Sequence, residues 1–193
     1  MLLIETIILS MIISKKKGYK LTPIFKSSWV IYPPIAFCLF YIFLEITTWM
    51  QWYYFIPYAY YIKTATLLSY VPLVIKYQLY QNEQGKLFPS PMIWAGFCLW
   101  LGSTLNKITL HFNNGYMPTF CDLSFWTRYT KPDGFIDGLH ILGNPYSNLI
   151  PICNIFDWGW TIVSVGDILV RFYAFIIIYY SIVLASSRVG MNI

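Results

Sequence analysis

The chain has 193 residues, of which 58% are hydrophobic and 11% are charged, and its formal net charge is +5. Soluble domains carry roughly a quarter charged residues, so this composition excludes an ordinary water-soluble domain. The cations stand in short segments beside apolar runs, where such residues set membrane topology, and we expect no nucleic-acid partner. The sequence predicts one integral membrane domain over residues 1–193, of the all-α class.

Apolar segments of helical length predict a polytopic transmembrane helix bundle of about five spans. The N-terminal segment is short, but its positive charges follow the apolar run and it has no small-residue cleavage site. We therefore expect an uncleaved first helix and no signal peptide. Lys63 and Pro72 interrupt the third segment. The expected spans are residues 1–14, 29–49, 58–77, 92–112 and 164–187.

Residues 113–163 form the long polar stretch of the chain, and we expect them to be an extracytoplasmic cap between the last two spans. Their Gly, Pro and Asn content predicts structured loops with at most one short helix. Cys121 and Cys153 both fall in this stretch and are candidates for a disulfide on the oxidising side of the membrane. A zinc site made by these cysteines and His140 is the alternative, but the spacing matches no compact ligand motif. We predict no metal and no cofactor.

The loop cations predict the orientation of the bundle. If the basic connector 15–26 lies inside, alternation places the N-terminus outside, the C-terminus inside and the 113–163 cap outside. The outer cations are then Arg128 and Lys131. The inner cations are more numerous: Lys15, Lys16, Lys17, Lys20, Lys26, Lys76, Lys86 and Arg188.

Ionisable groups inside the predicted spans are functional candidates, because a charge in the bilayer is costly. Helix alternation places all of them in the outer third of the membrane, where they could form one polar pocket. Asp167 and Arg171 share a helix face and can pair. We also expect the interhelical pairs Glu45–Lys63 and Lys107–Asp167. The alternative is that these pairs serve only helix packing. The groups are Glu45, Lys63, Lys107, His111, Asp167 and Arg171.

We predict a polar binding site beneath the cap. The sequence Ser164-Val165-Gly166-Asp167 has the S-x-x-D pattern of a capping box, which would satisfy the first amides of the last helix. Capping explains Ser164 and part of the role of Asp167, but it does not explain why Arg171 follows one turn later. The expected binding residues are Asn106, Lys107, His111, Asp167 and Arg171.

Two parts of the chain carry a family resemblance. The first comprises Leu101–Asn106 and Asn113–Pro118, and the second is Ser164–Val170. They resemble the bacterial membrane family catalogued as domain of unknown function 5317. That family has an Asn late in a helix, an Asn-Gly-rich turn with Met-Pro, and S-x-G-D opening the last helix. Asn114 stands where glycine is usual.

Residues 1–14 and the basic connector also resemble the opening of that family, so the resemblance spans most of the chain. It implies a small multi-pass protein of the bacterial cytoplasmic membrane. It implies no activity, because the family has none assigned.

A fainter resemblance is to signal peptidase II, the membrane aspartyl peptidase that trims lipoproteins. That enzyme opens its last helix with an N-x-A-D pattern, and Asp167 would hold the aspartate position. Asn154 and Asp157 match the Asn and the Asp of that pattern a few residues earlier. Thr119 stands where the second aspartate is expected, and Asp122 is the nearest carboxylate. This resemblance implies Asp167, Asp157 and Asp122 as catalytic candidates, two of which would share a proton.

Three function classes follow. We expect a non-enzymatic accessory or assembly subunit, or a ligand-binding bundle, with its polar site in the outer leaflet. The alternative is a membrane-embedded aspartyl peptidase. Transport ranks third, because the inner halves of the spans hold few ionisable groups and five spans do not divide into repeats. The expected partners are membrane lipid and a membrane protein or peptide.

Overall fold

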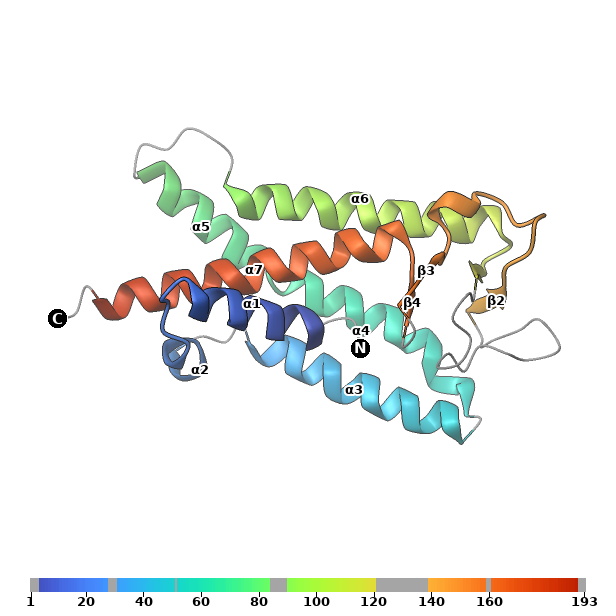
Figure 1. Ribbon diagram of the computed structural model, residues 1–193, viewed down its shortest axis with the longest axis horizontal. Helices are drawn as coiled ribbons and strands as arrows, with labels where there is room; N and C mark the ends of the chain where they lie inside the picture. The colour runs from blue at the N-terminus through green and yellow to red at the C-terminus, as the bar shows by residue number, and fades with distance from the viewer. Residues whose placement is uncertain are drawn as a thin grey trace.

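Helix α7 (Val165–Gly190) is the element on which the other helices pack. The computed structural model describes residues 4–27, 31–50, 52–83, 90–120, 139–158 and 161–190. Helix α7 contacts α1, α2 and α6 directly, and α6 makes the most extensive of these contacts (Figure 1). The remaining helices are α1 (Ile4–Lys16), α2 (Thr22–Ser27), α3 (Tyr32–Trp49), α4 (Ile56–Leu68), α5 (Val71–Glu83) and α6 (Pro91–Phe112), with a 3₁₀ turn η2 (Tyr53–Phe55) before α4.

The long helices run back and forth along the long axis of the molecule, and α4 and α5 run in the same direction (Figure 1). The end of α1, helix α2, the end of α5 and the C-terminal end of α7 lie at one end. The α3–α4 junction and the small strands lie at the opposite end. This arrangement keeps the basic connector after α1 away from the polar stretch that precedes α7.

Short strands build the cap. Strand β1 (Met117–Thr119) pairs in parallel with β2 (His140–Leu142), and β3 (Phe156–Asp157) pairs antiparallel with β4 (Ile162–Val163). A 3₁₀ turn, η3 (Ile150–Ile152), lies between β2 and β3. The prediction of loops with at most one short helix was therefore incomplete, because runs of two or three residues are too short to show a strand period.

The third predicted span, 58–77, is divided in the structure into α4 and α5. The helix breaks at Ser69 and Tyr70, just before Pro72, which has no N–H and disfavours helical geometry in the residue before it. The break leaves the Leu67 carbonyl with poor backbone pairing. The hydroxyl of Tyr173 on α7 donates to this carbonyl over 2.9 Å, and Tyr173 is only 1% exposed. A buried tyrosine thus satisfies the broken helix end.

Two glycines allow α6 and α7 to approach closely. A Cβ atom added to Gly102 would lie 2.5 Å from the carbonyl oxygen of Gly166 and 2.9 Å from the Cβ of Leu169. Real side chains do not reach such distances, so the backbones can meet here only without a side chain. Small residues at helix crossings serve the same purpose in membrane bundles.

The Asn-Gly turn ends α6 as the sequence predicts. Asn114 has φ +57° and Gly115 has φ +86°, and the Gly115 N–H donates to the Leu110 carbonyl over 2.7 Å. This six-to-one bond is the helix-ending pattern of a Schellman motif. Asn tolerates the left-handed conformation better than most residues, so Asn114 can occupy this position.

The helical class predicted from the sequence is confirmed, because most of the chain is helical. Among the described residues, one helical segment, Val165–Ser186, is long and apolar enough by composition to cross a membrane. The number of spans stays a prediction.

We predict that Gly102→Ala lowers the thermal unfolding temperature in mild detergent, with a loss of about 1–3 kcal/mol from overpacking. Gly96→Ala is the matched control, because Gly96 lies on the same helix and a Cβ there would meet no atom within 4 Å. Alanine favours a helix over glycine, so this control should be neutral or stabilised by up to about 1 kcal/mol. Equal effects of the two variants would contradict a close α6–α7 contact.

Candidate functional site

Four polar side chains from three helices meet at the start of α7. The Asp167 Oδ1 atom accepts a hydrogen bond from Asn106 Nδ2 at 3.1 Å and lies 3.3 Å from Lys63 Nζ. The Ser164 hydroxyl donates to Asn106 Oδ1 over 2.8 Å. We call Lys63, Asn106, Ser164 and Asp167 the Asp167 cluster. It joins α4, α6 and α7 directly after strand β4.

The S-x-G-D sequence explains how α7 begins. The Asp167 N–H donates to Ser164 Oγ at 3.0 Å, and the Ser164 N–H donates to Asp167 Oδ2 at 3.4 Å. These reciprocal bonds confirm the predicted capping box. A Cβ on Gly166 would overlap the side-chain amide of Asn106. The glycine is therefore required so that Asn106 can reach both Ser164 and Asp167.

The Asp167 cluster keeps its charges mostly out of solvent. The side chains of Lys63 and Asp167 are 26% and 14% exposed. Desolvated charges are stable only when they are paired and hydrogen-bonded, and here both conditions are met. The helix N-terminus adds a favourable partial positive charge next to the carboxylate. The arrangement therefore fixes an ionised Asp167 in one position between three helices.

Arg171 lies one turn further along α7 and has different partners from those we predicted. Its Nε atom lies 3.5 Å from Glu5 Oε2 on α1, and its guanidinium lies 4.8 Å from the ring centre of Trp158. Asp167 is engaged by Lys63, so the predicted Asp167–Arg171 and Lys107–Asp167 pairs are replaced by Lys63–Asp167 and Glu5–Arg171. The side chain of Glu45, the expected partner of Lys63, lies outside the described part of the structure.

Two predicted binding residues lie away from the Asp167 cluster. Lys107 and His111 are both exposed on α6. The ring of His111 lies 5.6 Å from that of its neighbour Phe112. Of the five predicted binding residues, the structure thus brings Asn106 and Asp167 into hydrogen-bond contact and places Arg171 one turn away.

The candidate catalytic aspartates do not form a dyad among the described residues. Asp167 bonds to Lys63, Asn106 and the Ser164 N–H, and Asp157 is not among its partners. Asp157 lies on β3 and is half-buried. Asp122 lies outside the described residues.

Cys153 carries a free thiol that is fully buried in the cap. Its Sγ donates to the carbonyls of Asn148 and Leu149 at 3.4 Å and 3.3 Å. Burial raises the pKa of this thiol to about 11, so it is protonated at neutral pH. Its predicted disulfide partner Cys121 lies outside the described residues, and the structure does not show the predicted pairing.

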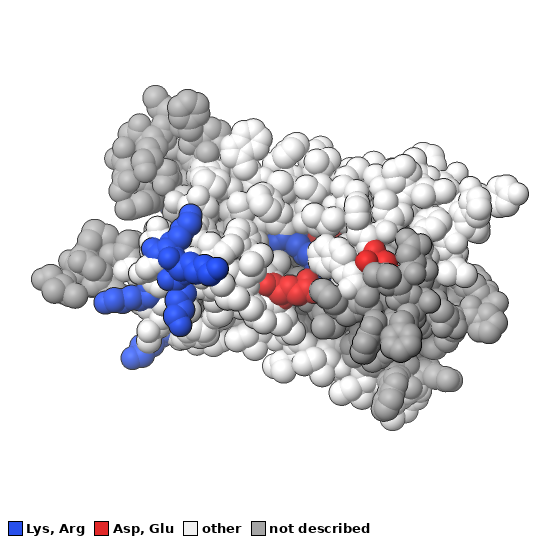
Figure 2. All heavy atoms as spheres, in the orientation of Figure 1, with Lys and Arg blue, Asp and Glu red and all other residues white. Residues whose placement is uncertain are grey.

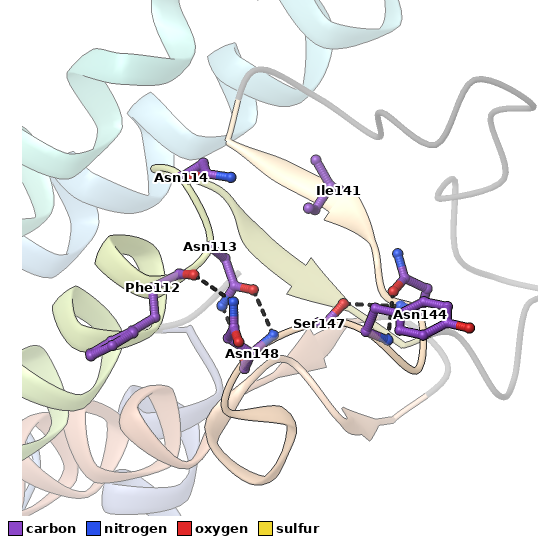
Figure 3. Close-up of a pocket in the computed structure, with 8 residues that line it drawn as sticks. Phe112, Asn113, Asn114, Ile141, Asn144, Ser147 and Asn148 are labelled. Atoms are coloured by element: carbon purple, nitrogen blue, oxygen red, sulfur yellow. Dashed lines mark hydrogen bonds between the residues drawn. The ribbon is translucent and has the colours of Figure 1, made fainter.

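A polar pocket of about 200 Å³ lies where the cap meets the end of α6 (Figure 3). Asn113 and Asn148, which line the pocket, bond to each other. The Asn113 side-chain amide donates to the Asn148 carbonyl at 3.0 Å, and the Asn148 N–H donates to Asn113 Oδ1 at 2.9 Å. Asn148 also donates to the Phe112 carbonyl at 2.8 Å. These bonds dock the cap on α6, so most of the amides that line the pocket serve structure.

Glu5 and Trp158 are the site residues that the sequence did not indicate. Glu5 is the one acidic residue in the apolar N-terminal segment, and an ionisable group in such a segment is itself a signal. Trp158 has no comparable signal, because aromatic residues make up 20% of the chain. Its contact with Arg171 depends on how the cap folds back on α7.

The fold and site together define a helical bundle whose last helix is anchored by a polar cluster beneath a small cap. The chain belongs to the family described as "Family of unknown function (DUF5317)", which matches residues 23–179. This match confirms the resemblance seen in the sequence. No curated protein and no solved structure shows significant similarity to the chain.

We predict that Asp167→Asn and Lys63→Met each lower the free energy of unfolding by about 1–3 kcal/mol, because each leaves a charged or polar partner unsatisfied. The double variant should lose less than the sum of the two, since the two groups bond to each other. Unfolding in detergent micelles measures all three variants. Lys107→Met is the control and should change stability by less than about 0.5 kcal/mol. Additive losses, or an equal loss for Lys107→Met, would exclude the Lys63–Asp167 pair.

Proposed function

We propose that this chain is a multi-pass protein of the bacterial cytoplasmic membrane that acts without catalysis. In this proposal it is an accessory or assembly subunit, or a ligand-binding bundle, and its polar site lies in the outer leaflet. The membrane location is supported by helices that bury polar side chains and expose apolar ones. The non-catalytic role is supported by the hydrogen bonds of Asp167.

The distribution of side chains on α1 is the observation that carries the membrane proposal. This helix buries Thr6, Ser10 and Ser14 against the bundle and exposes apolar side chains between them. The Ser10 hydroxyl donates to the Thr6 carbonyl at 2.6 Å and lies 3.2 Å from the Phe175 carbonyl of α7. A helix in water would place its polar side outward. Small polar residues between helices and apolar residues outside are typical of a bundle in lipid.

Other helices have the same outward apolar character. On α3 the exposed apolar side chains recur at helical spacing, and on α6 they include large aromatic residues. Soluble monomers rarely expose contiguous apolar patches of this extent, so lipid is the environment that fits them. The exposed residues are Ile35, Leu39, Ile42, Phe43 and Ile46 on α3, and Ile93, Trp94, Phe97, Trp100 and Ile108 on α6.

A basic end supports the predicted orientation. Figure 2 shows a group of basic side chains at the end where α7 finishes, and further basic atoms beside acidic ones in the middle of this face. The Lys20 N–H bonds to Ser186 Oγ at 3.0 Å, which ties the basic connector to the last turns of α7. Cations collect on the cytoplasmic side of membrane proteins, so this end is proposed to lie inside. The exposed lysines of the segment are Lys15, Lys16, Lys17, Lys20 and Lys26.

The hydrogen bonds of Asp167 favour a non-enzymatic role over an aspartyl peptidase. In an aspartyl peptidase the two catalytic carboxylates share a proton, and one of them presents an oxygen to water. Here Lys63 and Asn106 engage one oxygen of Asp167, and the Ser164 N–H engages the other. A carboxylate held in this way serves to position helices.

We predict that the cap is reached from outside the cell and the end of α5 only from inside. Two cysteines test this in a variant whose native cysteines are replaced by alanine: Tyr146→Cys in the cap, where the native side chain is 93% exposed, and Asn82→Cys on α5, also exposed. A membrane-impermeant maleimide should label position 146 on intact cells and position 82 only after permeabilisation. Labelling of position 82 on intact cells would overturn the topology. The native cysteines are Cys38, Cys98, Cys121 and Cys153.

We predict that wild type and Asp167→Asn retain the same proteins when they are purified in mild detergent, because Asp167 holds helices and does not turn over substrate. Monodisperse fractions of both forms are compared by mass spectrometry, with Asp157→Asn as a second variant. A lipoprotein or peptide that accumulates on an Asp-to-Asn variant, and not on wild type, would refute this proposal and support the peptidase.

A further inference from the structure

Arg171 is a buried cation whose hydrogen-bonding capacity is unused. The residue is 6% exposed. Its Nε, Nη1 and Nη2 atoms are buried and have no hydrogen-bond partner among the described residues. A guanidinium is always charged and presents five N–H donors, so leaving it unpaired in an apolar interior is costly. A buried, unpaired guanidinium therefore indicates a missing partner.

The neighbours of Arg171 compensate its charge but leave its donors free. Glu5 approaches the Nε atom at 3.5 Å without the geometry of a hydrogen bond. Trp158 covers a face of the guanidinium at 4.8 Å. The Asp167 carboxylate, one turn earlier, is occupied by Lys63 and Asn106. The Nη1 and Nη2 atoms thus have no acceptor, and because they are buried, a ligand with two acceptor oxygens must displace the side chains that cover them.

We propose that Arg171 binds the phosphodiester group of a membrane phospholipid. A phosphodiester offers two oxygens in the spacing that suits the two terminal nitrogens of arginine. It carries a single negative charge, so it meets less repulsion from Glu5 than a free phosphate dianion would. The proposed ligand is therefore a phospholipid that the site binds through its phosphate group.

The depth of Arg171 suits the head-group region. This inference rests on the proposed membrane location, in which α7 enters the bilayer near Val165. Arg171 then lies about 9 Å further along the helix axis, near the boundary between head groups and acyl chains. Tryptophan is enriched at that boundary, and Trp158 lies beside the guanidinium.

The experiment titrates phosphatidylglycerol and phosphatidylethanolamine separately into delipidated protein in detergent and counts bound lipid by native mass spectrometry. Wild type should bind one lipid molecule at a saturable site. Arg171→Gln should weaken this binding at least about tenfold, because two charge-assisted bonds are lost. Arg171→Lys should weaken lipid binding less, because lysine keeps the positive charge and loses only the paired donors of the guanidinium.

Two control variants separate lipid binding from packing. Lys76→Gln removes an exposed cation on α5 and should bind lipid like wild type. Glu5→Gln breaks the same ion pair but keeps the guanidinium, so it should also keep the lipid. Loss of lipid in Glu5→Gln as well as Arg171→Gln would mean that α1 packing is responsible and would overturn the proposal.

A final arm identifies the source of the phosphate. If inorganic phosphate raises the unfolding temperature of wild type in an Arg171-dependent way and the phospholipids do not, the lipid assignment is wrong. Equal lipid binding by wild type, Arg171→Gln and Arg171→Lys would also overturn it. If Arg171→Gln fails to fold, the comparison of Arg171→Lys with wild type tests the proposal instead.

Failure of this inference leaves the cysteine-labelling result intact, and a reversed labelling pattern would refute the membrane topology without changing the lipid titration.

Discussion

The packing of the helices next to the cap depends on one interaction, the pairing of the Asp167 carboxylate. A charge at the start of α7 is tolerated only because Lys63 and Asn106 reach it from α4 and α6. Asn106 can reach it only because Gly166 has no side chain, and α6 can lie close enough only because Gly102 has none. One buried charge thus specifies two glycines, two polar partners and the crossing of the two longest helices.

The break between α4 and α5 illustrates a second constraint, which is that backbone groups in an apolar interior need hydrogen-bond partners. Pro72 breaks the helix that would otherwise run from α4 into α5, and this break exposes a carbonyl. The Leu67 carbonyl keeps only a long 3.4 Å bond from the Tyr70 N–H, and Tyr173 on α7 supplies a second, shorter one at 2.9 Å. In the Asp167 cluster the neighbouring helices supply partners to α7, and at the α4–α5 break α7 supplies a partner to its neighbour, so α7 is one side of both contacts.

The sequence predicted those features that depend on local spacing. The capping box at Ser164 and Asp167, the Asn-Gly end of α6 and the helical class all follow from short patterns, and the structure confirms them. The ion-pair partners did not follow, because they depend on which helices surround α7. Lys107 and Lys63 are both at a suitable depth to reach Asp167, but only the arrangement of the helices decides that Lys63 faces inward and Lys107 faces out. For the same reason Glu5 was not expected beside Arg171.

The two charged residues of α7, Asp167 and Arg171, differ in how much of their hydrogen-bonding capacity is used within the chain. Asp167 is held by a lysine, an amide and a backbone N–H, so its bonding capacity is used within the chain. Arg171 has a carboxylate and an indole beside it, yet the terminal nitrogens of its guanidinium bond to none of the described residues. A charge needed only for packing would be expected to acquire hydrogen-bond partners, as Asp167 has done, because unsatisfied donors cost stability. A buried arginine with free donors, one turn from an aspartate that is bonded through both oxygens, is the contrast on which the proposed lipid site rests.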